Sequence, residues 1–280
     1  MAYTWVRGRV LVVDYAPDGD SARFAPDEPE TLRGLENADR LEPSDDDGSV
    51  QLRLDAIDSP EKDYQGEAQP LALPARDALL ARLGFTGLTY TEGQSVESAT
   101  PTELPAAIAS SLVEVNGRPV ALLYTGQDAE RFEDGADVEV DDALVDASVN
   151  AEQTRNGLAY ITVYSTTPAA VRARFVTLGQ AARDGGGPVW AADRSGGFTA
   201  RTQDDVGPDG ALVLPKLFRR VTDFLASESE QSFDAWLADQ GEDDDPVDVD
   251  GRRTTLSDLV TQDGDEIRLT ADPLSLVFVE

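Results

Sequence analysis

Alternating apolar and polar residues predict three β-strands in the first part of the chain. Residues 7–15 are rich in valine and leucine, and residues 21–24 alternate polar and apolar side chains. The Asp-Gly pair between these two segments is a strong hairpin signal. Residues 50–57 carry apolar side chains on one face and polar ones on the other, which is typical of a half-buried strand. The polar stretch 25–49 is predicted to be a loop inserted between the second and third strands.

The next segments predict helices and a second hairpin. Residues 74–83 place alanines and leucines on one helical face, begin with a proline and stop at Gly84, as a helix does. Residues 108–115 and 119–124 read as two strands joined by Asn116-Gly117. The stretch from 86 to 105 gives no clear pattern. Two more helices are predicted downstream, at 145–155 and at 168–183, the second ending at a run of glycines.

This order of elements indicates an α+β protein. Three strands, a helix, two strands and two helices are compatible with a five-stranded β-barrel of the OB-fold type with supporting helices. After residue 193 the composition changes, and residues 215–225 predict an amphipathic helix. Ser232 caps a second predicted helix, and 267–280 predict two closing strands. We therefore expect a barrel domain over residues 1–193 and a small α+β subdomain over residues 194–280.

The chain contains neither cysteine nor histidine, and this limits its chemistry. Disulfides, thiolate metal sites, cysteine nucleophiles and histidine bases are all excluded. Any hydrolytic reaction must therefore depend on carboxylates, arginines, tyrosines or a metal held by oxygen ligands.

The net charge of −31, from 54 acidic and 23 basic residues, is the main feature against a nucleic-acid partner. Such a surface repels polyanions at low salt. Its simplest interpretation is an adaptation for solubility in a salt-rich cytoplasm. The first residues lack the apolar core of a signal peptide, and no stretch approaches the roughly 18 apolar residues of a membrane span. The sequence thus predicts a cytoplasmic protein without a membrane partner.

Five positions stand out together: Asp20 in the first turn, Arg53 in the third strand, Asp58 and Glu61 just beyond it, and Arg118 after the second turn. Each alone is weak evidence, because short motifs often arise by chance. Their order, in Asp18-Gly19-Asp20-Ser21, Arg53-Leu54-Asp55-Ala56-Ile57-Asp58-Ser59-Pro60-Glu61 and Asn116-Gly117-Arg118-Pro119, resembles the thermonuclease (staphylococcal nuclease-like) family. The resemblance extends from Arg7 to about Asp193 and implies the same barrel and a nuclease activity on DNA, RNA or both.

The resemblance implies a Ca²⁺ site. Asp20 and Asp58 would supply carboxylate ligands and Ser59 a backbone carbonyl, and hard oxygen ligands suit this ion. A second acidic stretch, around Asp248 and Asp250, imitates part of an EF-hand loop, but it lacks the first and last ligands that this loop needs.

The resemblance also implies catalytic roles. Glu61 would orient or deprotonate the attacking water, while Arg53 and Arg118 would bind the phosphate and stabilise charge in the transition state. Guanidinium suits this task because its planar fork matches two phosphate oxygens. Tyr164 is a candidate for stacking or phosphate contact, and a core tyrosine is its alternative interpretation.

Two other functions remain open from the sequence. In the first, the nuclease-like barrel is catalytically weak or inactive and serves as a binding or scaffold module, with the C-terminal subdomain as the surface for a protein partner. In the second, the protein is a salt-adapted structural protein without a site. The five polar positions favour the enzyme, because carboxylates gathered without a cation repel one another. The net charge favours the scaffold.

Overall fold

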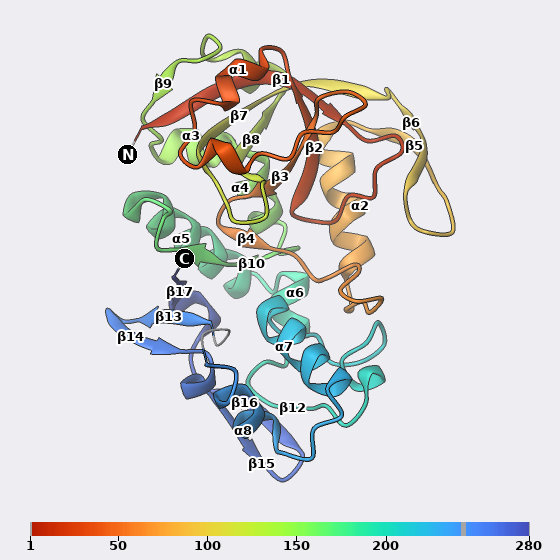
Figure 1. Ribbon diagram of the computed structural model, residues 1–280, viewed down its shortest axis with the longest axis vertical. Helices are drawn as coiled ribbons and strands as arrows, with labels where there is room; N and C mark the ends of the chain where they lie inside the picture. The colour runs from red at the N-terminus through yellow and green to blue at the C-terminus, as the bar shows by residue number, and fades with distance from the viewer. Residues whose placement is uncertain (1, 242–244, 280) are drawn as a thin grey trace. The chain divides into compact units, whose positions relative to one another are not determined.

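The computed structural model describes residues 2–241 and 245–279 (Figure 1). Its α-helices are α1 Pro29–Leu32, α2 Ala72–Leu83, α3 Asp142–Ala147, α4 Val149–Arg155, α5 Ala169–Asp184, α6 Pro188–Ala192, α7 Pro215–Ala226 and α8 Phe233–Ala238. Its strands are β1 Tyr3–Leu11, β2 Ser21–Pro26, β3 Val50–Leu54, β4 Ile57–Asp58, β5 Thr86–Tyr90, β6 Val96–Thr100, β7 Glu103–Val113, β8 Pro119–Thr125, β9 Asp137–Val138, β10 Tyr160–Ile161, β11 Val163–Tyr164, β12 Phe198–Thr199, β13 Pro246–Val249, β14 Arg252–Thr255, β15 Val260–Asp263, β16 Glu266–Leu269 and β17 Leu276–Phe278.

The chain forms two compact units, each assembled from several segments. The first unit comprises Met1–Asp55, Arg76–Gln153 and Ala169–Arg174, and the second comprises Ala56–Ala75, Thr154–Pro168 and Phe175–Glu280. The subdomain predicted over residues 194–280 lies within the second unit.

A closed five-stranded β-barrel forms the centre of the first unit. Its strands follow the order β1-β2-β3-β8-β7 and return to β1, and β9 adds to β1 from outside. β3 and β8 run parallel, whereas the other barrel neighbours are antiparallel. This confirms the predicted α+β architecture with an OB-like barrel and additional helices.

The predicted alternation produces the barrel interior. Leu52 and Leu54 of β3 are fully buried, while Arg53 between them is half-buried. Trp5 of β1 packs on Tyr124 of β8, with ring centroids 4.7 Å apart. Because successive side chains of a strand point to opposite faces, Arg53 lies on the outer face of the barrel.

Gly8 lies on β1 against the backbone of β2, and no side chain fits there. It pairs with Pro26 on β2 and Ala106 on β7, and a Cβ atom on it would lie 2.2 Å from the carbonyl oxygen of Ala25. We expect Gly8→Ala to lower the free energy of unfolding by about 2–3 kcal/mol, because the backbone must move to accept the methyl group.

Urea unfolding measured by circular dichroism checks this expectation. Gly93→Ala in the β5–β6 turn is the matched control, since the nearest atom to its new Cβ is 3.9 Å away. Equal stability of the two variants would contradict the tight closure of the barrel at Gly8.

The helices and strands predicted for this part of the sequence form, but several bounds differ. The first predicted strand, 7–15, is β1 and ends at Leu11. The third, 50–57, ends at Leu54, and Ile57–Asp58 form β4 in a separate sheet. α2, α5 and the β7–β8 hairpin lie close to the predicted ranges. The helix predicted over 145–155 is instead two helices, α3 and α4, because the extended backbone at Ser148 interrupts it and the Ser148 hydroxyl accepts from the Ala151 amide. The stretch without a clear pattern forms the β5–β6 hairpin, which projects from the barrel in Figure 1.

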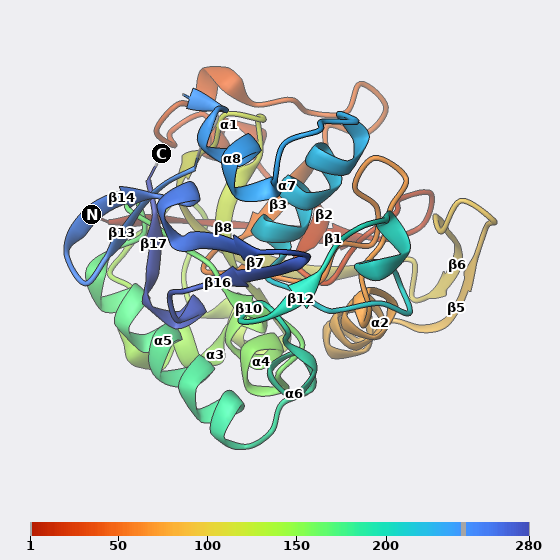
Figure 2. The ribbon, with the colours of Figure 1, turned by 90° about the horizontal axis from the view of Figure 1, so that it is seen from below.

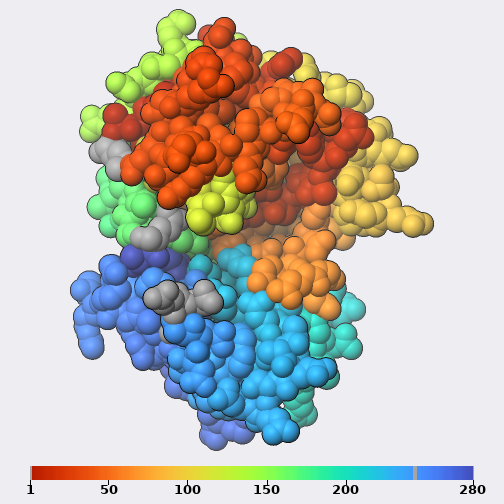
Figure 3. All heavy atoms as spheres, in the orientation of Figure 1, coloured from red at the N-terminus to blue at the C-terminus, as the bar shows by residue number. Residues whose placement is uncertain are grey.

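The insertion between β2 and β3 is partly structured, not only a loop. It contains α1 and a 3₁₀ turn at Ala38–Arg40, and it forms part of the surface of the first unit in Figure 3.

No helix in the described part of the chain has the length and apolar composition that crossing a bilayer demands.

The second unit has its own apolar core. Phe218 and Val221 of α7, Phe233 of α8 and Phe278 of β17 are buried in it, and α7 and α8 pack against each other through Phe224, whose ring centroid lies 5.4 Å from that of Phe233 (Figure 2). The two strands predicted over 267–280 form, but in different sheets. β16 joins β12 and β15, while β17 joins β11 and β13.

Candidate active site

The first unit brings Asp20, Arg53 and Arg118 close to one rung of the barrel. Arg53 pairs with Ser21, the residue after Asp20, and with Val120, two residues after Arg118. The Leu54 amide donates to the Asp20 carbonyl over 2.9 Å. Both predicted phosphate-binding arginines and one predicted metal ligand thus belong to the same end of β2, β3 and β8.

Arg118 is held by a buried acid that the sequence analysis did not single out. Its Nε donates to Oε1 of Glu114 over 2.8 Å, and Nδ2 of Asn116 donates to Oε2 over 2.8 Å. Burial favours the neutral acid, but the hydrogen bond and the charge of Arg118 outweigh it and hold the pKa of Glu114 below its usual value. The turn positions Arg118 through Gly117, whose φ is +77°.

Asp58, Ser59 and Glu61 belong to the second unit. Asp58 ends β4, which pairs with β10 through Tyr160, and both Asp58 and Ser59 are buried. The backbone at Glu61 is held by two hydrogen bonds. Its amide donates to Oε1 of Gln69 over 3.0 Å, and the Gln69 amide donates to the Glu61 carbonyl over 2.8 Å. The backbone that carries both carboxylates is therefore fixed.

The carboxylates of Asp58 and Glu61 converge on the guanidinium of Arg219 in α7. Nη2 of Arg219 donates to Oδ2 of Asp58 over 2.9 Å, Nη1 lies 3.4 Å from Oδ1, and Nη1 also donates to Oε1 of Glu61. The three side chains are 5%, 17% and 22% exposed for Asp58, Glu61 and Arg219. Burial disfavours the charged guanidinium, but attraction by the two carboxylates outweighs it and raises the pKa of Arg219 well above its ordinary value.

α7 is anchored on both sides of Arg219. Leu217, Phe218 and Val221 are fully buried in the core, and Asp245 accepts from Lys216 over 2.7 Å and from Arg220 over 2.8 Å. Burial raises the pKa of Asp245, but these two cations outweigh it, so that the net pKa is lowered. The helix was predictable from its apolar stripe, whereas no local pattern indicates which acids its arginines bind.

Tyr164 lies in the same unit, on β11. It pairs with Phe278 of β17, and Nζ of Lys216 lies 5.7 Å from the centroid of its ring. The tyrosine is half-buried and packs against the apolar core of the second unit.

The acidic residues in the described part of the chain do not form a metal cage. Ca²⁺ takes about six to eight oxygen ligands. Among residues 2–241 and 245–279, no group of three or more acidic side chains gathers closely enough to hold a metal ion. Asp58 and Glu61 supply two carboxylates at one point, and Arg219 already neutralises part of their charge.

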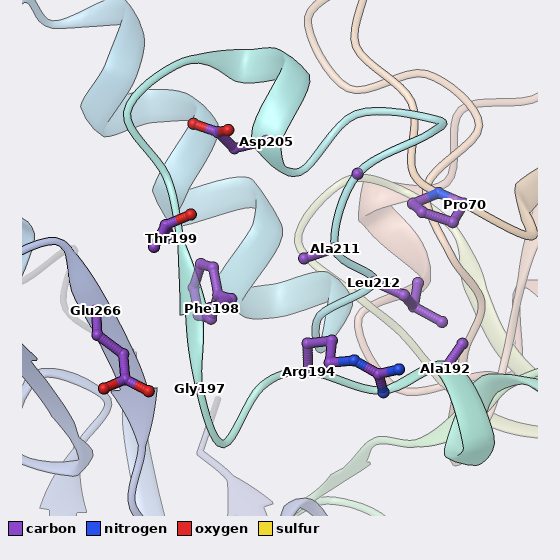
Figure 4. Close-up of a pocket in the computed structure, with 11 residues that line it drawn as sticks. Pro70, Ala192, Arg194, Gly197, Phe198, Thr199, Asp205, Ala211, Leu212 and Glu266 are labelled. Atoms are coloured by element: carbon purple, nitrogen blue, oxygen red, sulfur yellow. The ribbon is translucent and has the colours of Figure 1, made fainter.

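A pocket of about 630 Å³ in the second unit has a different lining. Phe198, Ala211 and Leu212 form apolar walls, with Arg194 and Glu266 among its polar residues (Figure 4). None of the residues predicted from the sequence to form the site lines it. We therefore do not assign the predicted chemistry to this pocket.

Comparison with models of known protein families and with curated proteins gives no match.

Proposed function

We propose that this chain is a nuclease of the thermonuclease type, which hydrolyses phosphodiester bonds of DNA, RNA or both with the help of Ca²⁺. The observation that carries the proposal is the end of the OB-like barrel at β2, β3 and β8, where Arg53 and Arg118 lie beside Asp20. The carboxylates of Asp58 and Glu61, which converge on one point, add support.

In this proposal Asp20, Asp58 and the Ser59 carbonyl would hold the ion as oxygen ligands. A bound Ca²⁺ would supply positive charge to the phosphate and favour ionisation of the attacking water. Glu61 accepts the proton of that water as it attacks phosphorus, which is the task of a general base.

Arginine and tyrosine side chains bind the substrate. Arg53 and Arg118 donate to phosphate oxygens and stabilise the charge that develops on them. Glu114 orients Arg118 through the hydrogen bond to its Nε, which leaves the Nη groups for phosphate. Tyr164 stacks on a base or contacts a phosphate.

A binding or scaffold module is the second candidate, and Arg219 is the observation that favours it. Two carboxylates held together need a cation, and Arg219 provides one from within the chain. The net charge of −31 also opposes binding of a polyanion. In this case the C-terminal subdomain over residues 194–280 would contact a protein partner, and no cleavage would occur.

We expect the cleavage rate to rise with salt from low ionic strength. Few arginines would contact phosphate, so few counterions are released on binding. The affinity for the substrate therefore falls only slightly as salt rises. Repulsion between the acidic surface and the substrate weakens as the Debye length falls from about 30 Å at 0.01 M to about 3 Å at 1 M. The rate should therefore reach its maximum at or above roughly physiological ionic strength.

Initial rates on short labelled oligonucleotides, one of DNA and one of RNA, test both points across a salt series at saturating Ca²⁺. A steady decline from the lowest salt upward would show that local phosphate contacts dominate. No cleavage of either substrate at any salt would rule out the nuclease and favour the binding module.

A further inference from the structure

The pocket of about 630 Å³ lies wholly within the second unit, and backbone hydrogen bonds fix its walls. The Arg194 amide donates to the Leu212 carbonyl over 2.8 Å, and the Ala211 amide donates to the Asp205 carbonyl over 2.8 Å. Gly210 permits this close return of the chain, because a Cβ atom on it would lie 2.5 Å from backbone atoms of the preceding turn. The pocket is therefore preformed, and its volume lies within the roughly 300–1,000 Å³ of small-molecule sites.

The lining of this pocket is mostly apolar. Phe198 on β12 and Leu212 are almost fully buried, whereas Ala192 and Ala211 are half-buried and leave apolar surface for a ligand to cover. Pro70 adds a further apolar contact. An aromatic ring or a branched aliphatic group fits this lining, because leaving water for an apolar wall is favourable for such a group.

Arg194 brings a positive charge to the pocket that the described chain does not neutralise. Its Nη1 donates to the carbonyls of Ala191 and Asp193, over 3.2 Å and 2.8 Å. No carboxylate in residues 2–241 and 245–279 forms an ion pair with it, because Oδ1 of the adjacent Asp193 accepts from the hydroxyls of Tyr160 and Ser195 instead. The Nε–Nη2 edge of the guanidinium therefore has donors for both oxygens of a carboxylate.

The other charged residues of the pocket already have partners, and they limit the charge of a ligand. Oε2 of Glu266 accepts from Arg268 over 2.7 Å, and Oδ2 of Asp205 accepts from the amides of Thr202 and Arg201. These amides lower the pKa of Asp205, so it stays ionised at neutral pH. Figure 4 shows both acids away from the guanidinium of Arg194. A ligand with one negative charge fits this arrangement, whereas a second negative charge would meet the acids.

We propose that this pocket binds a small monocarboxylate with an aromatic or branched aliphatic body. The carboxylate pairs with Arg194, and the body lies against Phe198, Ala211 and Leu212. The site shares no residue with the proposed nuclease site, so it requires neither nucleic acid nor a metal ion.

A titration of the full-length wild-type chain, followed by the amide signals of Gly197 and Ala211 in nuclear magnetic resonance spectra, tests the proposal. The probes are 3-phenylpropionate, its neutral amide 3-phenylpropanamide and inorganic phosphate, each up to millimolar concentration. We expect the carboxylate to shift both signals and to bind about tenfold more tightly than the amide, since only the carboxylate forms charge-assisted hydrogen bonds. Phosphate, which lacks the apolar body, should leave both signals unchanged.

Variants then assign the preference to Arg194. Because this side chain is exposed, Arg194→Gln should fold and bind the carboxylate no more tightly than the amide. Arg252→Gln is the matched control, since it removes the same charge from an exposed position of the same unit outside the pocket. It should keep the tenfold preference. Ala211→Phe should weaken binding of both organic probes, because the added ring fills the pocket.

Equal affinity of the wild type for the carboxylate and the amide would overturn the proposal, as would the absence of shifts with the carboxylate. So would shifts of the same two signals by phosphate, or a preference that survives in Arg194→Gln or disappears equally in Arg252→Gln. The comparison of the three probes needs only the wild-type chain, so it decides the matter even if a variant does not fold.

Discussion

Replacing Asn150 by leucine is expected to lower the free energy of unfolding by about 4 kcal/mol. The substitution removes hydrogen bonds from buried backbone groups, and each such loss costs about 1–3 kcal/mol. Asn150 in α4 is fully buried. Its Oδ1 accepts from the Leu123 amide, and its Nδ2 donates to the carbonyls of Asp55 and Ala121, each over 3.0 Å. The Ala121 carbonyl still accepts from the Asp55 amide in the variant. The lost hydrogen bonds therefore matter most for the Leu123 amide and the Asp55 carbonyl.

Urea unfolding and hydrogen exchange at the Leu123 amide measure this effect. Asn156→Leu, at an exposed position after α4, controls for the change of residue type and should alter stability by less than about 0.5 kcal/mol. A loss below about 1 kcal/mol in Asn150→Leu would show that water or a rearranged backbone replaces the amide.

Glu61→Gln is expected to lower turnover at least about 10²-fold at saturating Ca²⁺, because an amide cannot accept the proton of the attacking water. The substitution keeps the size of the side chain and an oxygen for Arg219. Asp63→Asn is the matched control, since it removes an exposed carboxylate two residues away. Circular dichroism verifies that both variants fold.

Turnover of Glu61→Gln within about threefold of the wild type would assign the base to another residue, because loss of a general base costs about 10²-fold or more. An equal fall in the turnover of Asp63→Asn would instead indicate a general effect of acidic charge on this segment.

The strands of the barrel could be predicted because the sequence patterns that indicate them are local. Alternation around Leu52 and Leu54, and the turn at Asn116-Gly117, each depend on a few neighbouring residues. The β5–β6 hairpin was missed because its strands are mostly polar and exposed. Ser148 interrupts a helix that periodicity alone would continue, since a serine hydroxyl caps a new helix as readily as it fits inside one.

The contacts of the candidate site were harder to predict. The link between Glu114 and Arg118 spans only four residues across a turn, so spacing could have indicated it. The contact between Arg219 and Asp58 joins residues 161 positions apart. Such a pair depends on how the second unit folds, and a single sequence carries no signal for it.

The proposed nuclease activity is tested by the initial rate at which the wild-type chain cleaves a labelled single-stranded oligonucleotide, at saturating Ca²⁺ and again in excess chelator. We predict cleavage with Ca²⁺ and its loss in chelator, restored when Ca²⁺ is added back. Equal cleavage in both conditions would contradict the role of the metal, and absence of cleavage in both would contradict the nuclease.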